Sequence, residues 1–273
     1  MSAVTGLLGA MVGLVLGLTG AGGSIFAVPL LMWGLGGTLP QATPVALLAV
    51  CASASFGTIA AWDVALVRYR AAMLMAATSW LLAPFGLRLA TRLPLPALLL
   101  AFAVVLATVA ARMLHQALRA PADASVVRAA VAAPVCQLNP ATGRIVWTRA
   151  ALGVVAGIGA VAGFLAGLLG VGGGFVIVPA LRAVSDLTMH SAVATSLMAI
   201  ALISAGTVAV AAWQGHLIPW LTAVPFVGGA LVGMFAGRRL APRIAGPRLQ
   251  RVFAVAMLAV ALLLALSVVP NTH

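Results

Sequence analysis

Long apolar segments in close succession are the feature that most constrains the fold of this chain. Ten of them lie at residues 4–18, 24–37, 43–62, 71–91, 95–114, 150–169, 175–185, 191–213, 217–237 and 248–269. A helix needs roughly 20 apolar residues to cross the hydrocarbon core of a bilayer. The pattern therefore predicts an all-α polytopic membrane protein. It has about eight apolar segments if the short pair that opens each half of the chain is counted once.

The charged residues support a membrane location and argue against a nucleic-acid partner. Only 7% of the residues are charged, whereas a soluble domain carries roughly a quarter. All fifteen basic residues are arginine, and they lie mainly at the ends of apolar segments, where arginines reach lipid headgroups and set orientation. We therefore expect membrane lipid around the chain, and we attribute the net charge of +12 to topology rather than to nucleic-acid binding.

An internal repeat divides the chain into two related halves. The 23 residues from Gly9 and the 23 residues from Gly159 match at a constant shift of 150, with eleven identities that include six glycines and Pro29 with Pro179. The polar stretch 115–149 separates the halves. We therefore assign residues 1–114 to a first transmembrane repeat, 115–149 to a linker, and 150–273 to a second transmembrane repeat.

The arginine distribution predicts inverted topology for the two repeats. If each opening pair of short segments enters the membrane and returns, thirteen arginines share one side and only Arg88 and Arg92 lie opposite. If each pair counts as one crossing, the arginines divide seven to eight and indicate no orientation. The positive-inside rule favours the first arrangement, which places the linker in the cytoplasm and both termini outside.

Glycine clusters interrupt the opening segments of both repeats. Residues 20–24 read Gly-Ala-Gly-Gly-Ser and residues 170–174 read Gly-Val-Gly-Gly-Gly. Non-helical backbone persists inside a membrane only where it is buried in protein or lines a wet cavity. The helix that restarts at Ser24 or Gly174 exposes first-turn N–H groups, which form an anion site without a cationic side chain. Two inverted copies direct two such helix starts toward one midplane cavity, which is a common transporter plan.

Other glycines have the spacing of helix-packing residues. They recur every four positions in three segments, at Gly9, Gly13 and Gly17, at Gly159, Gly163 and Gly167, and at Gly229, Gly233 and Gly237. Small residues at this spacing let transmembrane helices approach closely. We interpret these nine glycines as packing positions. Neither glycine cluster completes a nucleotide-binding motif, because Ile25 and Phe175 occupy the last glycine position.

Few polar side chains lie within the apolar segments. The hydroxyls that can reach an oxyanion belong to Thr19, Ser53, Ser55, Thr58, Thr195, Ser196, Ser204 and Thr207, although such hydroxyls often bond to their own helix instead. Neither the acids nor the histidines cluster at ligand or catalytic spacing. We therefore expect no metal site, no cofactor and no catalytic residue. The predicted substrate-binding residues are Thr19, Gly20, Gly22, Gly23, Ser24, Gly170, Gly172, Gly173, Gly174, Thr195 and Ser196.

The paired motifs from Gly20 to Pro29 and from Gly170 to Pro179 resemble those of the sulfite exporter TauE/SafE family of bacterial membrane transporters. The stretch Ala194-Thr195-Ser196-Leu197 is also similar to that family, whereas Ala42-Thr43-Pro44-Val45 departs from its pattern in the first half. The resemblance implies a multi-pass protein of the bacterial cytoplasmic membrane. It also implies a cargo such as sulfite, a sulfonate or a related organosulfur anion.

Together these features predict a secondary transporter or facilitator for a small oxyanion. An anion channel or a membrane assembly factor shares the same composition, and an intramembrane enzyme is a weaker alternative because no nucleophile with a base is apparent. Substrate identity, direction, coupling ion and oligomeric state, a homo-oligomer included, stay open.

Overall fold

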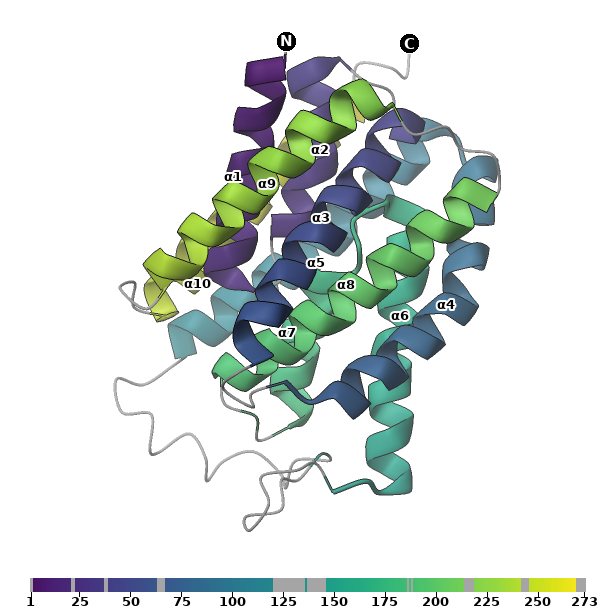
Figure 1. Cartoon of the computed structure of the whole chain (residues 1–273). Helices are drawn as coiled ribbons and strands as arrows, with labels where there is room; N and C mark the ends of the chain where they lie inside the picture. The colour runs from purple at the N-terminus through teal and green to yellow at the C-terminus, as the bar shows by residue number, and fades with distance from the viewer. Residues whose placement is uncertain are drawn as a thin grey trace.

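The computed structural model describes residues 2–20, 23–36, 39–62, 67–119, 136, 146–185, 187, 189–213, 219–241 and 246–268. Within these residues the chain forms ten helices (Figure 1). They are α1 (Ser2–Thr19), α2 (Gly23–Leu35), α3 (Leu39–Trp62), α4 (Tyr69–Arg92), α5 (Leu95–Arg119), α6 (Arg149–Leu169), α7 (Gly174–Val184), α8 (Met189–Trp213), α9 (Trp220–Leu240) and α10 (Gly246–Val268). Each corresponds to one predicted apolar segment, and the all-α polytopic class is confirmed.

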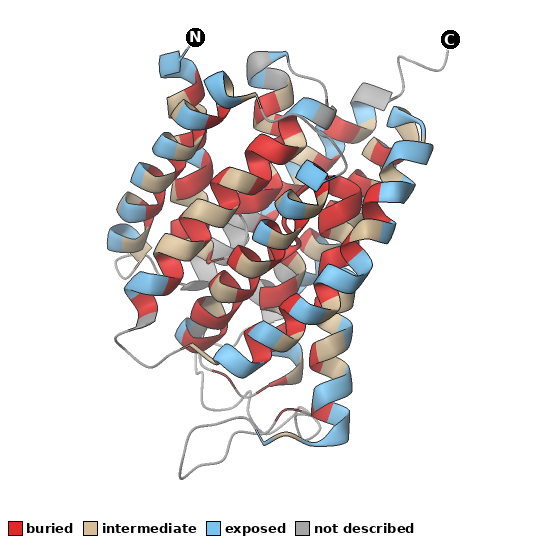
Figure 2. Ribbon diagram, turned by 45° about the vertical axis from the view of Figure 1, so that its right-hand side comes forward, coloured by how far each residue is buried: buried red, intermediate tan, exposed pale blue. Residues whose placement is uncertain are grey.

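Seven of the helices are long and apolar enough to cross a membrane. The helices α2 and α7 are shorter, with 13 and 11 residues. At 1.5 Å per residue they span roughly 20 Å and 17 Å, which is less than the ~30 Å hydrocarbon core. Many exposed side chains are large and apolar, such as Leu221 at 94% exposure, so the outer surface suits lipid. Figure 2 shows buried positions on the inner faces of the helices and exposed positions on the outer faces.

The short helices turn back along the helices that precede them. A Cβ placed at Gly23 in α2 would lie 2.5 Å from the carbonyl oxygen of Val12, and one at Gly34 would lie 2.5 Å from the side chain of Leu8. In the second half, a Cβ at Gly173 would lie 2.3 Å from the carbonyl oxygen of Ala162. Each opening pair is therefore two antiparallel helices. Counted separately, the opening helices bring the total among the described residues to ten rather than about eight.

The two halves interlock rather than stand side by side. Helix α1 packs along α9, and α6 packs along α4. A Cβ at Gly9 would lie 2.1 Å from the carbonyl oxygen of Phe226, and one at Gly159 would lie 2.4 Å from the Cα of Met75. The contacted positions differ by a shift of 151, so the second contact repeats the first. Each half therefore supplies its first helix to the other half.

The predicted packing role of the nine regularly spaced glycines is confirmed. A Cβ at Gly13 would lie 1.9 Å from the carbonyl oxygen of Ala230, and one at Gly233 would lie 2.0 Å from that of Ala10. The other seven likewise leave no room for a Cβ against neighbouring backbone. These contacts bring α1 to α9 and α4 to α6 at backbone distance, as small residues allow in membrane bundles.

Equivalent helices also meet each other at the centre of the bundle. Contacts join α3 to α8, α5 to α10 and α2 to α7. Cys51 of α3 donates its thiol to the carbonyl oxygen of Ala201 of α8 at 3.5 Å, and these two positions are equivalent at the shift of 150. Helix α1 begins at one end of the bundle, whereas its counterpart α6 begins at the other end (Figure 1). The orientation of these ends relative to the cytoplasm stays a prediction.

Cys136, in the middle of the linker, contacts the bundle. The N–H of Cys136 donates to the carbonyl oxygen of Val184 at 2.9 Å, and an isolated parallel bridge pairs Cys136 with Ser185. The Cys136 side chain is fully buried, and this burial raises the pKa of its thiol. The remaining linker positions between 120 and 145 lie outside the described residues.

Candidate functional site

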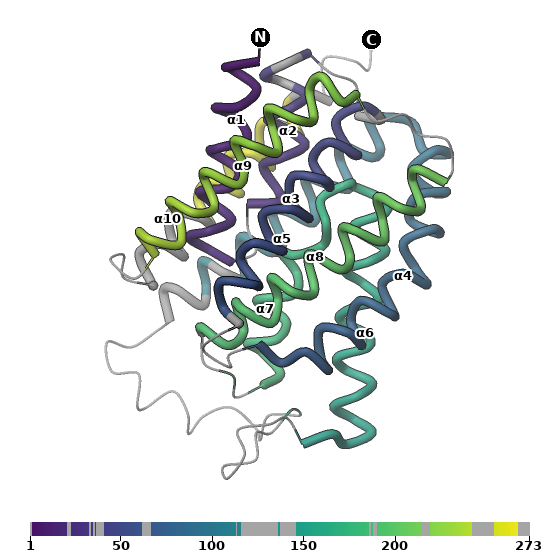
Figure 3. The backbone as a smooth tube through the Cα atoms, in the orientation of Figure 1, coloured from purple at the N-terminus to yellow at the C-terminus, as the bar shows by residue number. Residues whose placement is uncertain are grey.

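The glycine break of the second half is a chain of left-handed backbone conformations. Helix α6 ends at Gly170, whose φ is +69° and whose N–H donates to the carbonyl oxygen of Ala166 at 2.9 Å. Gly172 and Gly173 follow with φ of +69° and +63°. Only glycine adopts these values without strain. Helix α7 then begins at Gly174, with Gly173 as its N-cap and no side-chain cap. Figure 3 follows the backbone from α6 into α7.

The break of the first half begins in the same way. Helix α1 is followed by Gly20, whose φ is +74° and whose N–H donates to the carbonyl oxygen of Leu16 at 2.7 Å. Ala21 and Gly22 lie outside the described residues, so the predicted role of Gly22 stays a prediction. The chain resumes as α2 at Gly23, followed by Ser24, which is fully buried.

Each break lies against a helix of the other half. A Cβ at Gly20 would lie 2.1 Å from the side chain of Val193 in α8, and one at Gly170 would lie 2.4 Å from the side chain of Thr43 in α3. Thr43 and Val193 are equivalent positions at the shift of 150, so the two contacts form a matched pair. Both breaks are therefore held at the centre of the bundle, against α3 and α8.

Four of the eight predicted hydroxyls, those of Thr19, Thr58, Ser196 and Thr207, donate to backbone carbonyls. Thr19 donates to its own helix at Val15, at 2.7 Å. Ser196 donates to the carbonyl oxygen of Val193 at 2.8 Å and also reaches that of Gly20 at 3.3 Å. The structure therefore brings Ser196 and Gly20 together across the two halves. The Thr19 hydroxyl is not free, because it donates to a carbonyl oxygen of its own helix.

Thr195 connects the break region to a cation. Its Oγ1 accepts a hydrogen bond from the backbone N–H of Arg68 at 3.0 Å. Arg68 precedes α4 and is half-buried, and its Nε is buried without a hydrogen-bond partner among the described residues. The backbone of a cationic residue therefore contacts Thr195. The next residue, Ser196, contacts Gly20. Arg68 was not predictable as a site residue, because its position before a helix is also typical of an arginine that sets topology.

Comparisons with known proteins agree with this architecture. The family model described as "Sulfite exporter TauE/SafE" matches residues 5–264. A "Probable membrane transporter protein" of Xylella fastidiosa strain 9a5c is 32% identical over 259 residues, which cover 93% of this chain and 91% of the relative. The protein of the same name from strain Temecula1 gives the same identity and coverage. No solved structure matches. This chain belongs to the sulfite exporter TauE/SafE family.

Family membership establishes the general role of the molecule. As a TauE/SafE protein it is a multi-pass bacterial membrane protein, and its family and relatives are named for transport rather than for catalysis. These names do not assign any residue to the cargo. Within the described residues no group of three or more histidine, cysteine or acidic side chains is placed to hold a metal ion.

Two of the eight predicted hydroxyls, those of Ser53 and Ser204, are buried without a hydrogen-bond partner among the described residues, and Ser204 lies at the second break. Ser204 in α8 is fully buried, and its Oγ has no hydrogen-bond partner among the described residues. This oxygen lies 2.8 Å from the position of a Cβ at Gly172. Val50 of α3 lies on the same glycine at 3.4 Å. At the shift of 150 the first-half counterpart of Ser204 is Ala54, whereas at the shift of 151 that relates the helix ends Trp62 and Trp213 it is Ser53.

Proposed function

We propose that this transporter carries a small oxyanion of the sulfite or sulfonate type and binds it at the glycine breaks, with Ser204 as a hydrogen-bond donor at the second break. The proposal extends the transporter role to a cargo and a site. The family name supports the sulfur oxyanion class, and the geometry at Gly172 supports the site.

The orientation of the Ser204 hydroxyl is the observation that carries this proposal. Thr58 of α3 and Thr207 of α8 each donate to the carbonyl oxygen four residues back at 2.8 Å. Ser204 does not, and a buried hydroxyl without a partner costs free energy. Its Oγ instead faces Gly172, two residues before α7 begins. An oxyanion there would accept a hydrogen bond from Ser204 and from first-turn N–H groups of α7.

The charge balance around the breaks favours an anion over a cation. The three acidic residues, Asp63, Asp123 and Asp186, all lie outside the described residues, so the described helices carry no carboxylate. Arg68 adds a positive charge near Thr195. The positive end of the α7 dipole adds partial positive charge at the break itself. These contributions have the same sign.

The two breaks differ in the groups that face them. Ser204 faces the second break, whereas the nearest neighbours of the described first-break glycines, Gly20 and Gly23, are Val193, Leu16 and Val12. The first break has the Ser196 hydroxyl against Gly20, but that hydroxyl also donates to Val193. We therefore place the main anion contact at the second break.

The test is transport of radiolabelled sulfite, sulfate and a sulfonate into proteoliposomes. Ser204→Ala should lower the apparent affinity for the transported anion by about 10-fold to 100-fold, because a hydrogen bond to a charged group contributes roughly 1.5–3 kcal/mol. Gly172→Val should abolish transport, since the added side chain disfavours the positive φ and occupies the space in front of Ser204.

Ser79→Ala is the matched control. Ser79 is also fully buried with an unpartnered Oγ among the described residues, but it lies in α4 against Gly163, away from the breaks. This variant should transport with unchanged affinity. Wild-type transport by both Ser204→Ala and Gly172→Val would contradict the proposed site, and the absence of transport for all three anions would contradict the proposed cargo.

A further inference from the structure

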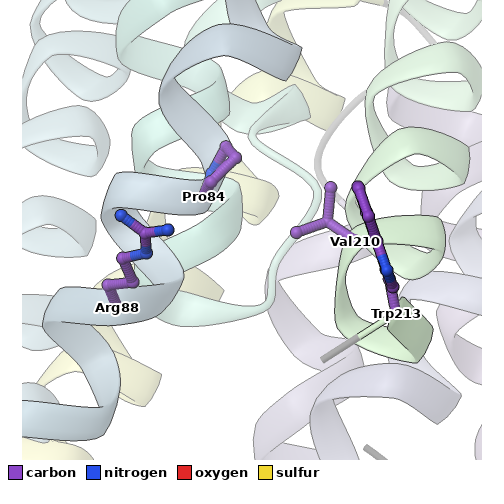
Figure 4. Close-up of a pocket in the computed structure, with 4 residues that line it drawn as sticks. All are labelled: Pro84, Arg88, Val210 and Trp213. Atoms are coloured by element: carbon purple, nitrogen blue, oxygen red, sulfur yellow. The ribbon is translucent and has the colours of Figure 1, made fainter. Parts of the chain in front are cut away.

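A cavity opens between α4 and α8 on the periphery of the bundle. Its volume is about 420 Å³, and it is lined by Pro84, Arg88, Val210 and Trp213 (Figure 4). Arg88 is exposed, and Trp213 is 92% exposed. Arg88 lies one turn before the end of α4, and Trp213 is the last residue of α8. An arginine and a tryptophan at helix ends are typical of the level of lipid headgroups.

Trp80, two turns before Arg88 in α4, also contacts α8. Residues 80, 84 and 88 are four apart, so they lie on one face of the helix. The indole N–H of Trp80 donates to the carbonyl oxygen of Leu202 at 2.9 Å, and its ring covers Gly206. The two helices are thus joined at Trp80, and the cavity lies between that contact and the helix ends.

The equivalent place in the other half contains the protein's own aromatic side chains. At the shift of 151 the position equivalent to Pro84 is Phe235, whose ring packs against that of Phe56 in α3. The centroids of these two rings are 6.3 Å apart. Arg239, which is equivalent to Arg88, holds its guanidinium 4.2 Å from the centre of the Phe235 ring. Pro84 replaces the Phe235 ring in α4, and the cavity lies beside it, between the Trp80 contact and the helix ends.

We propose that a membrane phospholipid occupies this cavity. Its phosphate binds Arg88, and the part of an acyl chain nearest the headgroup lies along Pro84 and Val210. A guanidinium binds phosphate oxygens in a bidentate manner, and the rest of the lining is apolar or an interfacial tryptophan. Anionic headgroups are preferred because none of the described residues carries a side-chain carboxylate that could compete with the lipid phosphate for Arg88.

The proposal is tested by native mass spectrometry of the detergent-purified protein titrated with phosphatidylglycerol. Arg88→Ala should weaken the tightest lipid-binding event by about fivefold, which corresponds to the roughly 1 kcal/mol that one basic residue contributes near an anionic surface. Val210→Phe, which restores a ring to the cavity, should weaken it while Arg88 is intact. Arg92→Ala is the control, because Arg92 ends the same helix and is exposed but does not line the cavity.

Three further measurements keep the outcome decisive. Thermal unfolding of each variant shows that the fold is retained, and Arg88→Lys should keep most of the lipid affinity because it keeps the charge. Inorganic phosphate at millimolar concentration should not displace the lipid. Unchanged lipid binding in both Arg88→Ala and Val210→Phe would overturn the proposal. Displacement by inorganic phosphate alone would overturn it in favour of a site for free anions.

Discussion

Two glycines of the same helix should respond in opposite directions to the same substitution. Gly163 and Gly157 both lie in α6, six residues apart. Gly163 is buried against α4, where a Cβ would lie 2.4 Å from the Cα and 2.5 Å from the carbonyl oxygen of Ser79. Gly157 is exposed, and a Cβ there would meet nothing within 4 Å. We expect Gly163→Ala to destabilise the protein and Gly157→Ala to stabilise it.

The size of the effect follows from these distances. Ordinary contact begins at 3.4 Å, so Gly163→Ala must separate α6 from the α4 backbone by about 1 Å. A gap of that size forfeits a quarter to a half of each dispersion contact it opens, and overpacking of this kind costs about 1–3 kcal/mol. Gly157→Ala removes the glycine penalty of a helix interior, which is up to about 1 kcal/mol. The two variants should differ by roughly 2–4 kcal/mol.

The assay is thermal unfolding of the two purified variants in the same detergent, read by fluorescence-detected size exclusion. For a chain of this size the expected gap in melting temperature is on the order of 5–15 °C, with wild type between the two variants. Equal melting temperatures would refute the reasoning, because they would mean that the α4–α6 contact yields to a methyl group without loss. A lower melting temperature for Gly157→Ala alone would refute it as well.

Two further predictions concern topology and the linker. A reporter fused at Thr272 should behave as external, because the arginine distribution places both termini opposite the linker; a cytoplasmic signal there would contradict the inverted arrangement. In a Cys51→Ser background, iodoacetamide should alkylate Cys136 more slowly in the folded protein than in the denatured chain. Burial raises the pKa of the Cys136 thiol, so the folded chain carries less thiolate at pH 8, and the ratio of the two rates should narrow as the pH rises. A ratio that does not change with pH would contradict the raised pKa.

The helices were predictable from the sequence because apolar length alone specifies them in a membrane. The least accurate boundaries lie where polar residues continue a helix beyond its apolar run. Helix α3 begins at Leu39 rather than at residue 43, and α5 continues to Arg119 rather than ending at residue 114. The residues Leu39 and Pro40 at the start of α3, and Arg119 at the end of α5, lie outside the apolar runs from which the boundaries were predicted. Hydropathy therefore does not locate such ends.

The partners of the helices were not predictable in the same way. Periodic glycines identify the packing face of α1 and of α6, but periodicity carries no information about which helix covers that face. Nothing in the sequence alone indicated that α1 would cross to α9 and α6 to α4. The same limit applied to Ser204. Its hydroxyl was one of eight candidates, and only the structure separates it from Thr207, which bonds to its own helix.

The structure also separates two classes of glycine that look alike in the sequence. Gly163 has helical backbone, and the nearest atoms to its missing Cβ include the backbone of Ser79. Gly170 and Gly172 have positive φ, and their nearest neighbours are the side chains of Thr43 and Ser204. Neighbouring backbone moves only if a whole helix moves, whereas a side chain changes rotamer. The α1–α9 and α4–α6 contacts are therefore the stiff parts of the bundle, and the breaks are where it can yield. For the proposed site at the breaks, we therefore expect cargo entry to keep those two helix pairs intact and to move the side chains of α3 and α8 that cover Gly170 and Gly172.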